Sequence, residues 1–247
     1  MAQFDPRSAA SAYPTRTGAA VDEGLRSYML GVYNYMAAGV ALTGVAAYLT
    51  SMMAVGADGQ LTAFGTALYA SPLKWVVMLA PLAFVFFLSF RIEKMSVGAA
   101  QLTFWLFAAV MGVSLSSIFL VFTGQSIAQI FFITAATFGS LSLWGYTTKR
   151  DISGWGSFLF MGLIGIILAS IVNIFLQSSG LQFAVSVIGV LVFAGLTAYD
   201  TQRIKEMYSS MDDDGTLGRK AVMGALSLYL DFINLFMMLL RLVGDRR

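Results

Sequence analysis

Seven apolar stretches, each close to the length of about 20 residues that crosses the hydrocarbon core of a bilayer, constrain this chain more than any other feature. A backbone in lipid must satisfy its own hydrogen bonds, and segments of this length do so as helices rather than as barrel strands. Short connections between the stretches predict one compact bundle. The sequence therefore predicts an all-α fold, a polytopic membrane protein built as a bundle of seven transmembrane helices. The expected spans are residues 26–50, 73–91, 99–122, 127–147, 155–177, 182–203 and 221–243.

The composition supports lipid as the solvent and excludes several classes of function. Apolar residues make up 58% of the chain and charged residues only 11%, whereas soluble domains are about 25% charged. The chain has no cysteine and no histidine, which excludes disulfides, thiolate metal sites and histidine-based catalysis or metal binding. The net charge of +2 is too small to indicate a nucleic-acid partner. We therefore expect neither an enzyme nor a resident cofactor.

The chain is expected to divide into a tail and one membrane domain. Residues 1–24, with Pro6, Pro14 and scattered charges, are predicted to be a disordered cytoplasmic N-terminal tail. No signal-peptide pattern is evident there, so the first membrane segment is expected to act as an uncleaved insertion signal. Residues 25–247 are predicted to form a single seven-helix transmembrane domain.

The distribution of Lys and Arg predicts the orientation. If all seven segments cross, eleven basic residues lie at one end of the bundle and four at the other, which places the N-terminus in the cytoplasm. The eleven are Arg7, Arg16, Arg26, Arg91, Lys94, Lys149, Arg150, Arg203, Lys205, Arg219 and Lys220, and the four are Lys74, Arg241, Arg246 and Arg247. A last segment that enters and returns would move the C-terminus inside, but its length favours a full crossing.

Two carboxylates inside apolar stretches are the candidate functional site. Asp231 lies near the middle of the last stretch, where a charge costs roughly 2.5–3.5 kcal/mol on insertion scales. Asp200 lies near the end of the preceding stretch, and Arg91 ends the second, so all three belong to the same half of the bundle. Two such acids cannot both ionise cheaply and are expected to titrate as one unit, with Arg91 as a cationic partner. The pair also offers hard oxygens for transient contact with Ca²⁺, although two carboxylates supply fewer than the six to eight oxygens that Ca²⁺ prefers.

Simpler structural roles remain open for these and other polar residues. Asp200 could lie at the water interface while Asp231 bonds to a neighbouring helix, and Asn173 and Asn234 are expected to form interhelical hydrogen bonds. The run Asp212–Gly215 lacks the alternating ligands and closing Glu of an EF-hand, which indicates a solvated loop.

Two other membrane functions fit poorly. No lysine lies inside an expected span to bind retinal, and the residues before Asp231 lack the glycines of an intramembrane aspartyl protease, although Tyr199–Asp200 matches half of that signature.

The segments GLTAYDTQRIKEMY at 195–208 and MGALSLYLDFINLFMMLLRLVGDRR at 223–247 closely resemble the C-terminal signature of the Bax inhibitor-1 (transmembrane Bax inhibitor motif) family, and of its bacterial branch in particular. The ends of the second and fourth spans, at Arg91 and Lys149–Ser153, fit that pattern more weakly. The resemblance implies a seven-helix fold with the last helix at the centre, surrounded by the other six. It also implies a pH-sensitive calcium leak channel, with Asp200 and Asp231 as the sensor and Arg91 as their partner. The loop between the two motifs is longer here than in the family, so its part in gating is open.

The resulting functional prediction is a multi-pass protein of the bacterial plasma (inner) membrane that leaks Ca²⁺ under the control of protons. Its expected partners are the lipid bilayer, Ca²⁺ and protons. Other bacterial members resemble modulators of a membrane-bound ATP-dependent protease, and in that alternative residues 1–24 would bind the partner.

Overall fold

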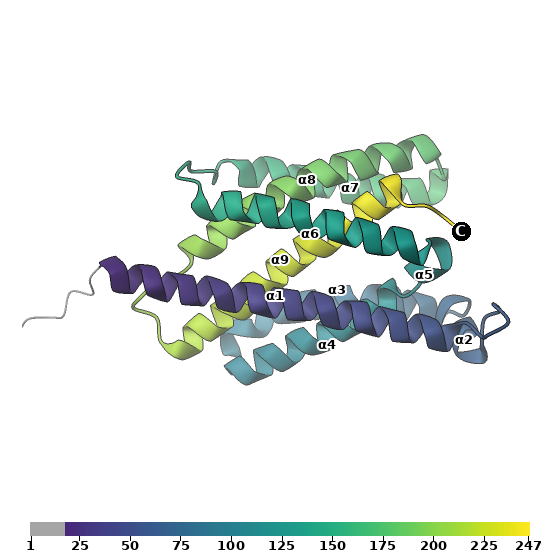
Figure 1. Cartoon of the computed structure of the whole chain (residues 1–247), viewed down its shortest axis with the longest axis horizontal. Helices are drawn as coiled ribbons and strands as arrows, with labels where there is room; N and C mark the ends of the chain where they lie inside the picture. The colour runs from purple at the N-terminus through teal and green to yellow at the C-terminus, as the bar shows by residue number, and fades with distance from the viewer. Residues whose placement is uncertain (1–17) are drawn as a thin grey trace, which may run out of the picture.

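The computed structural model describes the backbone of residues 18–247 and the side chains of residues 23–247 (Figure 1). These residues form nine α-helices and one 3-10 turn, Ile92–Lys94. The helices are α1 (Gly18–Ala54), α2 (Ala63–Tyr69), α3 (Leu73–Arg91), α4 (Val97–Leu115), α5 (Ile118–Val121), α6 (Gly124–Thr147), α7 (Trp155–Leu176), α8 (Ser179–Glu206) and α9 (Asp214–Val243).

Within residues 18–247, seven helical segments are long and apolar enough to cross a membrane, which confirms the predicted fold class. Helix α1 begins at Gly18, so the predicted tail is helical from that residue onward, and the rest of it lies outside the described residues. Helix α9 begins seven residues before the predicted span, because Asp213 caps its N-terminus by accepting a hydrogen bond from the backbone N–H of Thr216. The prediction missed this polar first turn because its residues are not apolar.

Helix α9 forms the core of the bundle. In its most apolar window 67% of the residues are buried, against 39% or less in every other span of the described chain. Figure 1 shows α9 running obliquely through the bundle, where it packs on α1, α4, α6 and α8. Helices α3 and α7 pack mainly against α4 and α8, so the expected ring of six helices is instead an inner set of four with two outer helices.

The third span is a broken helix rather than the continuous one predicted over 99–122. Helix α4 ends at Leu115, and the short α5 starts at Ile118. At the break, Ser116 donates its hydroxyl to the carbonyl of Val113 at 2.5 Å, and this hydroxyl also bonds to that of Tyr69 at 2.7 Å. A serine that bonds back to the preceding turn in this way bends a helix.

The two ends of the described chain lie at opposite ends of the bundle (Figure 1). After α9, the backbone pairs with the linker between α5 and α6: Thr123 donates to Asp245, and Arg247 donates to Val121. Helix α9 is therefore one unbroken helix that does not turn back, and its full crossing of the membrane stays a prediction.

Candidate functional site

Asp231 lies inside the core helix and is 5% exposed. Its Oδ2 atom is buried and has no hydrogen-bond partner among the described residues. Buried polar atoms are nearly always paired, so an unpartnered carboxylate oxygen in the core of this apolar bundle makes Asp231 a candidate functional residue. The alternative that Asp231 simply bonds to a neighbouring helix has no support at this atom.

Asp200 lies on α8, which packs along α9, and its side chain is half-buried. Asp200 and Asp231 thus lie on two packed helices, near enough for the charge of one to act on the other, and their role as a titrating pair stays a prediction. Arg203, one turn further along α8, is the cation that acts on Asp200. The structure thus places two acids on adjacent helices, with the cation at the same end of the bundle.

Arg91 is exposed at the end of α3, and the 3-10 turn that follows it contacts α9. Within residues 23–247 it forms no ion pair with Asp200 or Asp231. Its predicted role as their partner stays a prediction, whereas Arg203 is the cationic neighbour that sequence reasoning missed. The signal was available, since Arg203 follows Asp200 by three residues and shares a helix face with it.

A chain of hydroxyl groups reaches α8 beside Asp200. Thr201 donates to the carbonyl of Thr197 at 2.7 Å, so its oxygen must accept from Ser142 at 2.8 Å, and Ser142 in turn accepts from Tyr33 at 2.6 Å. This chain joins α1, α6 and α8 and ends one residue from the acid. It fixes the position of the α8 segment that carries Asp200.

The hydroxyl groups of Thr43 and Tyr229 form a hydrogen-bonded pair in the middle of the bundle. Thr43 donates to the carbonyl of Ala108 at 2.8 Å and accepts from the Tyr229 hydroxyl at 2.6 Å. The Tyr229 ring is fully buried, with edge contacts to Phe104 and Phe107. These contacts connect α1, α4 and α9 and fix the position of α9 two residues before Asp231.

The loops at the Asp200 end are fastened by long polar side chains. The Gln202 amide accepts from the backbone of Ile152 and donates to the carbonyl of Arg150, at 3.0 and 2.8 Å. Lys205 donates to the carbonyl of Tyr146 at 2.9 Å. The Gln202 contacts hold the α6–α7 loop, and the Lys205 contact holds the last turn of α6, against the end of α8.

The acidic run between α8 and α9 has structural roles. Asp212 forms an ion pair with Lys220 at 2.6 Å, and that lysine also donates to the carbonyl of Met207. Hydrogen bonds from the side chain and backbone of Thr216 lower the pKa of Asp213. The run, which was predicted to be a solvated loop, is therefore a loop fastened by an ion pair together with the cap of α9.

Within the part of the chain whose side chains the structure describes, Asn173 and Asn234 do not form the predicted bonds between packed spans. Asn234 donates to Leu230 of its own helix at 2.8 Å, and Asn173 accepts from the backbone of Ser178 in the connection after α7, at 2.9 Å. A short polar side chain in a helix readily bonds to nearby backbone, and both asparagines form such local bonds instead of bonds to another span.

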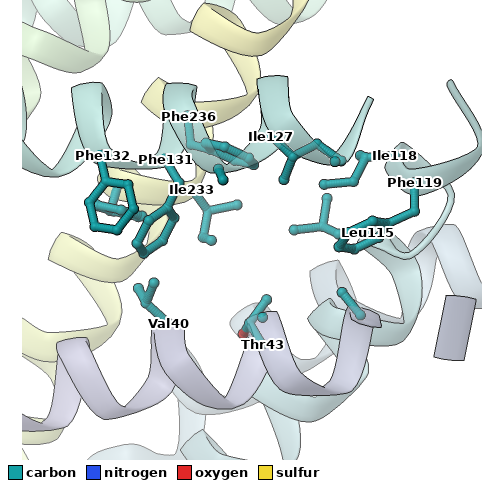
Figure 2. A pocket seen from close by; sticks show the side chains of 15 residues that line it. Val40, Thr43, Leu115, Ile118, Phe119, Ile127, Phe131, Phe132, Ile233 and Phe236 are labelled. Atoms are coloured by element: carbon teal, nitrogen blue, oxygen red, sulfur yellow. The ribbon is translucent and has the colours of Figure 1, made fainter. Parts of the chain in front are cut away.

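An apolar cavity of about 330 Å³ lies between α1, α5, α6 and α9 (Figure 2). Figure 2 shows Phe131, Phe132 and Phe236 pointing toward it from one side, and Val40 and Thr43 from α1. Thr43 already uses its hydroxyl in the Tyr229 pair, so this space offers no ligand for an ion. Among the described residues no group of three or more acids could hold a metal ion either. The carboxylates of Asp200 and Asp231 can chemically accept a proton or contact a passing cation, but two carboxylates do not enclose a metal ion.

Comparison with known proteins places the whole membrane domain in one group. The sequence model of a protein family described as "Inhibitor of apoptosis-promoting Bax1" matches residues 25–247. An uncharacterized protein of Rickettsia prowazekii is 48% identical over 227 residues, covering 92% of both chains. The inner membrane protein YbhL of Escherichia coli K12 is 48% identical, covering 91% of this chain and 94% of the relative. A protein of Caulobacter vibrioides is 45% identical over the full length of both.

Proposed function

This chain belongs to the Bax inhibitor-1 family, and from that premise we propose that it is a multi-pass membrane protein that leaks Ca²⁺ passively under the control of protons. The observation that supports this proposal best is the buried carboxylate of Asp231, whose Oδ2 atom is unpartnered and whose charge interacts with that of Asp200 on the next helix. We propose transport rather than catalysis, with no resident cofactor.

The proposed control is electrostatic. Two neighbouring carboxylates repel each other strongly in a low-dielectric site, and a shared proton removes that repulsion. The number of protons on the pair therefore changes the contact between α8 and α9. Arg203 on α8 and Arg91 at the end of α3 supply positive charge at this end of the bundle, and protonation of the pair weakens their attraction to it. The carboxylates are also the first oxygens that we expect a Ca²⁺ ion to contact.

We further propose that the protein lies in the bacterial inner membrane with its N-terminus in the cytoplasm. The distribution of basic residues supports this orientation, and it puts the aspartate pair in the cytoplasmic half. The chain contains no cysteine, so single-cysteine variants test the orientation cleanly. With a membrane-impermeant maleimide on intact cells without an outer-membrane barrier, Asp58→Cys should label and Lys149→Cys should not. The reverse pattern would overturn the orientation.

Ca²⁺ entry into dye-loaded proteoliposomes, measured across pH, tests the leak itself. We expect a flux that depends on pH in the wild type and loses that dependence in Asp231→Asn. Asp58→Asn is the matched control, because it removes one carboxylate charge from an exposed loop outside the bundle. This control should keep the wild-type profile.

Wild-type flux no greater than that of empty liposomes at any pH would show that the leak proposal is wrong. The alternative function, a modulator of a membrane-bound ATP-dependent protease, then becomes testable. Removal of residues 1–17 should abolish co-purification with the protease, whereas Asp231→Asn should not.

A further inference from the structure

A polar pocket of about 370 Å³ lies at the end of the bundle opposite Asp200, where α7 ends, α8 begins and α9 ends. Six of its eight lining residues are polar, and none is acidic. The six are Ser170, Asn173, Gln177, Gln182, Ser186 and Arg241. A cluster of this kind is unusual between spans whose surfaces are otherwise apolar.

The pocket is rich in hydrogen-bond donors that have no partner. Within residues 23–247, Arg241 takes part in no ion pair and no hydrogen bond, although a guanidinium carries five N–H donors. Asn173 uses its Oδ1 atom to accept from the backbone of Ser178, which leaves its N–H₂ group as a free donor at the pocket. Gln177 is held at φ 49°, in the left-handed region, at the C-terminal end of α7. The backbone turn thus presents an amide side chain where a continuing helix would not.

The depth of the pocket matches the level of lipid head groups. Helix α7 has 22 residues and is about 33 Å long, close to the ~30 Å thickness of a hydrocarbon core. Asn173 and Arg241 each lie within one turn of a helix end. Phe175 and Phe183, each next in sequence to a lining residue, are 82% and 62% exposed, which provides an apolar surface for acyl chains at this level.

We propose that this pocket binds a phosphate group, with Arg241 as its principal ligand and the amides of Asn173, Gln177 and Gln182 as additional donors. A planar guanidinium matches the oxygens of phosphate with two parallel charge-assisted hydrogen bonds, and uncharged amides complete the set without repelling an anion. The same chemistry would repel Ca²⁺. The phosphate can belong to a membrane phospholipid or to a soluble phosphate, and the depth and flanking phenylalanines make the phospholipid the expected source.

The phosphate site is independent of the proposed leak. Gln182 and Asp200 are eighteen residues apart on α8, which corresponds to about 27 Å. Binding at the pocket is therefore expected whether or not the chain conducts Ca²⁺.

Native mass spectrometry of the delipidated full chain, titrated with phosphatidylglycerol, tests the site. Loss of charge-assisted hydrogen bonds should weaken retention of one lipid by about tenfold to a hundredfold in Arg241→Gln. Arg241→Lys keeps the positive charge but loses the planar guanidinium, so its lipid retention should lie between that of the wild type and that of Arg241→Gln. Arg246→Gln is the matched control, because it removes an exposed arginine from the same end of the molecule outside the pocket.

A second arm separates the two sources of phosphate. The melting temperature of the delipidated protein is measured in inorganic phosphate and in chloride at equal ionic strength. If wild type retains more phosphatidylglycerol than Arg241→Gln and phosphate does not change the melting temperature, the site binds a phospholipid. If phosphate raises the melting temperature of the wild type and Arg241→Gln abolishes that rise, the site binds a soluble anion. Equal lipid retention by wild type, Arg241→Gln and Arg246→Gln, with no phosphate-specific stabilisation of the wild type, would overturn the site. Variants that melt as the wild type does in chloride exclude misfolding as the cause.

Discussion

Replacing Gly145 by alanine should push α6 away from α8 at the end of the bundle that carries Asp200. A Cβ atom at Gly145 would lie 2.4 Å from the carbonyl oxygen of Ala198 and 3.0 Å from its Cα atom. These are backbone atoms, which cannot rotate away as a flexible side chain can. The oxygen contact must open by about 1 Å to reach an ordinary separation. Gly139, nearly two turns earlier on α6, has nothing within 4 Å of the same atom, so Gly139→Ala is the matched control.

The expected magnitude follows from two opposing effects. Overpacking of this kind costs about 1–3 kcal/mol, whereas alanine in place of glycine stabilises a helix interior by about 1 kcal/mol. The helix effect is common to both variants and cancels in their difference. Gly145→Ala should therefore be about 1–3 kcal/mol less stable than Gly139→Ala. For a chain of this size that corresponds to melting temperatures that differ by roughly 2–12 °C.

Tryptophan fluorescence during thermal unfolding in one detergent measures this difference, and proteoliposome flux shows whether it reaches the site. Because Ala198 precedes Asp200 by two residues, the displaced segment of α8 carries the acid with it. We expect Gly145→Ala to change the pH profile of the flux and Gly139→Ala to leave it unchanged. Equal melting temperatures for the two variants would refute the close approach of α6 and α8, and with it the argument that backbone contact positions Asp200.

Three further substitutions test other parts of the structure. Thr43→Val should destabilise the protein by about 1–3 kcal/mol because the buried Tyr229 hydroxyl loses its acceptor. Adding Tyr229→Phe should recover part of that loss in the same thermal assay. Stability losses of the two single variants that simply add in the double variant would contradict the pairing. The pKa of Asp213 is lowered by Thr216, so the cap stabilises α9 above the ordinary carboxyl range near pH 4 and loses this effect as the pH falls through the lower folded-state pKa. Hydrogen exchange of the first α9 turn should follow that loss in the wild type but not in Asp213→Asn, which keeps the cap without titrating. Gln202→Ala should expose the α6–α7 loop to trypsin, detected as faster cleavage at its basic residues, and an unchanged rate would show that the amide does not hold the loop.

The spans could be predicted because lipid imposes a simple rule on length and polarity, whereas the central position of α9 was implied only by the family resemblance. The close placement of Asp200 and Asp231 could also be predicted, because each lies in a long apolar run and the two runs are consecutive in the chain. The structure places them on packed helices, while their function as a proton sensor stays a prediction.

The contacts around the acids could not be predicted, since they depend on which residues face each other across helices. Tyr33 and Thr201 are far apart in sequence, and nothing in either segment identifies Ser142 as the residue between them. The break at Ser116 and the left-handed Gln177 also depend on local hydrogen bonds that an apolar pattern does not encode. Arg203 differs, because its spacing from Asp200 was visible and a helix-face argument would have found it.

The position of α9 has a consequence for biogenesis. The most buried helix of the described chain also follows the other six spans in sequence, so α1, α4, α6 and α8 enter the membrane before the surface on which they pack exists. Until α9 arrives, these helices hold polar groups such as Thr43 without their final partners. A chain that stops before Asp214 would lack its centre rather than an edge, and membrane quality-control machinery should remove it as unassembled.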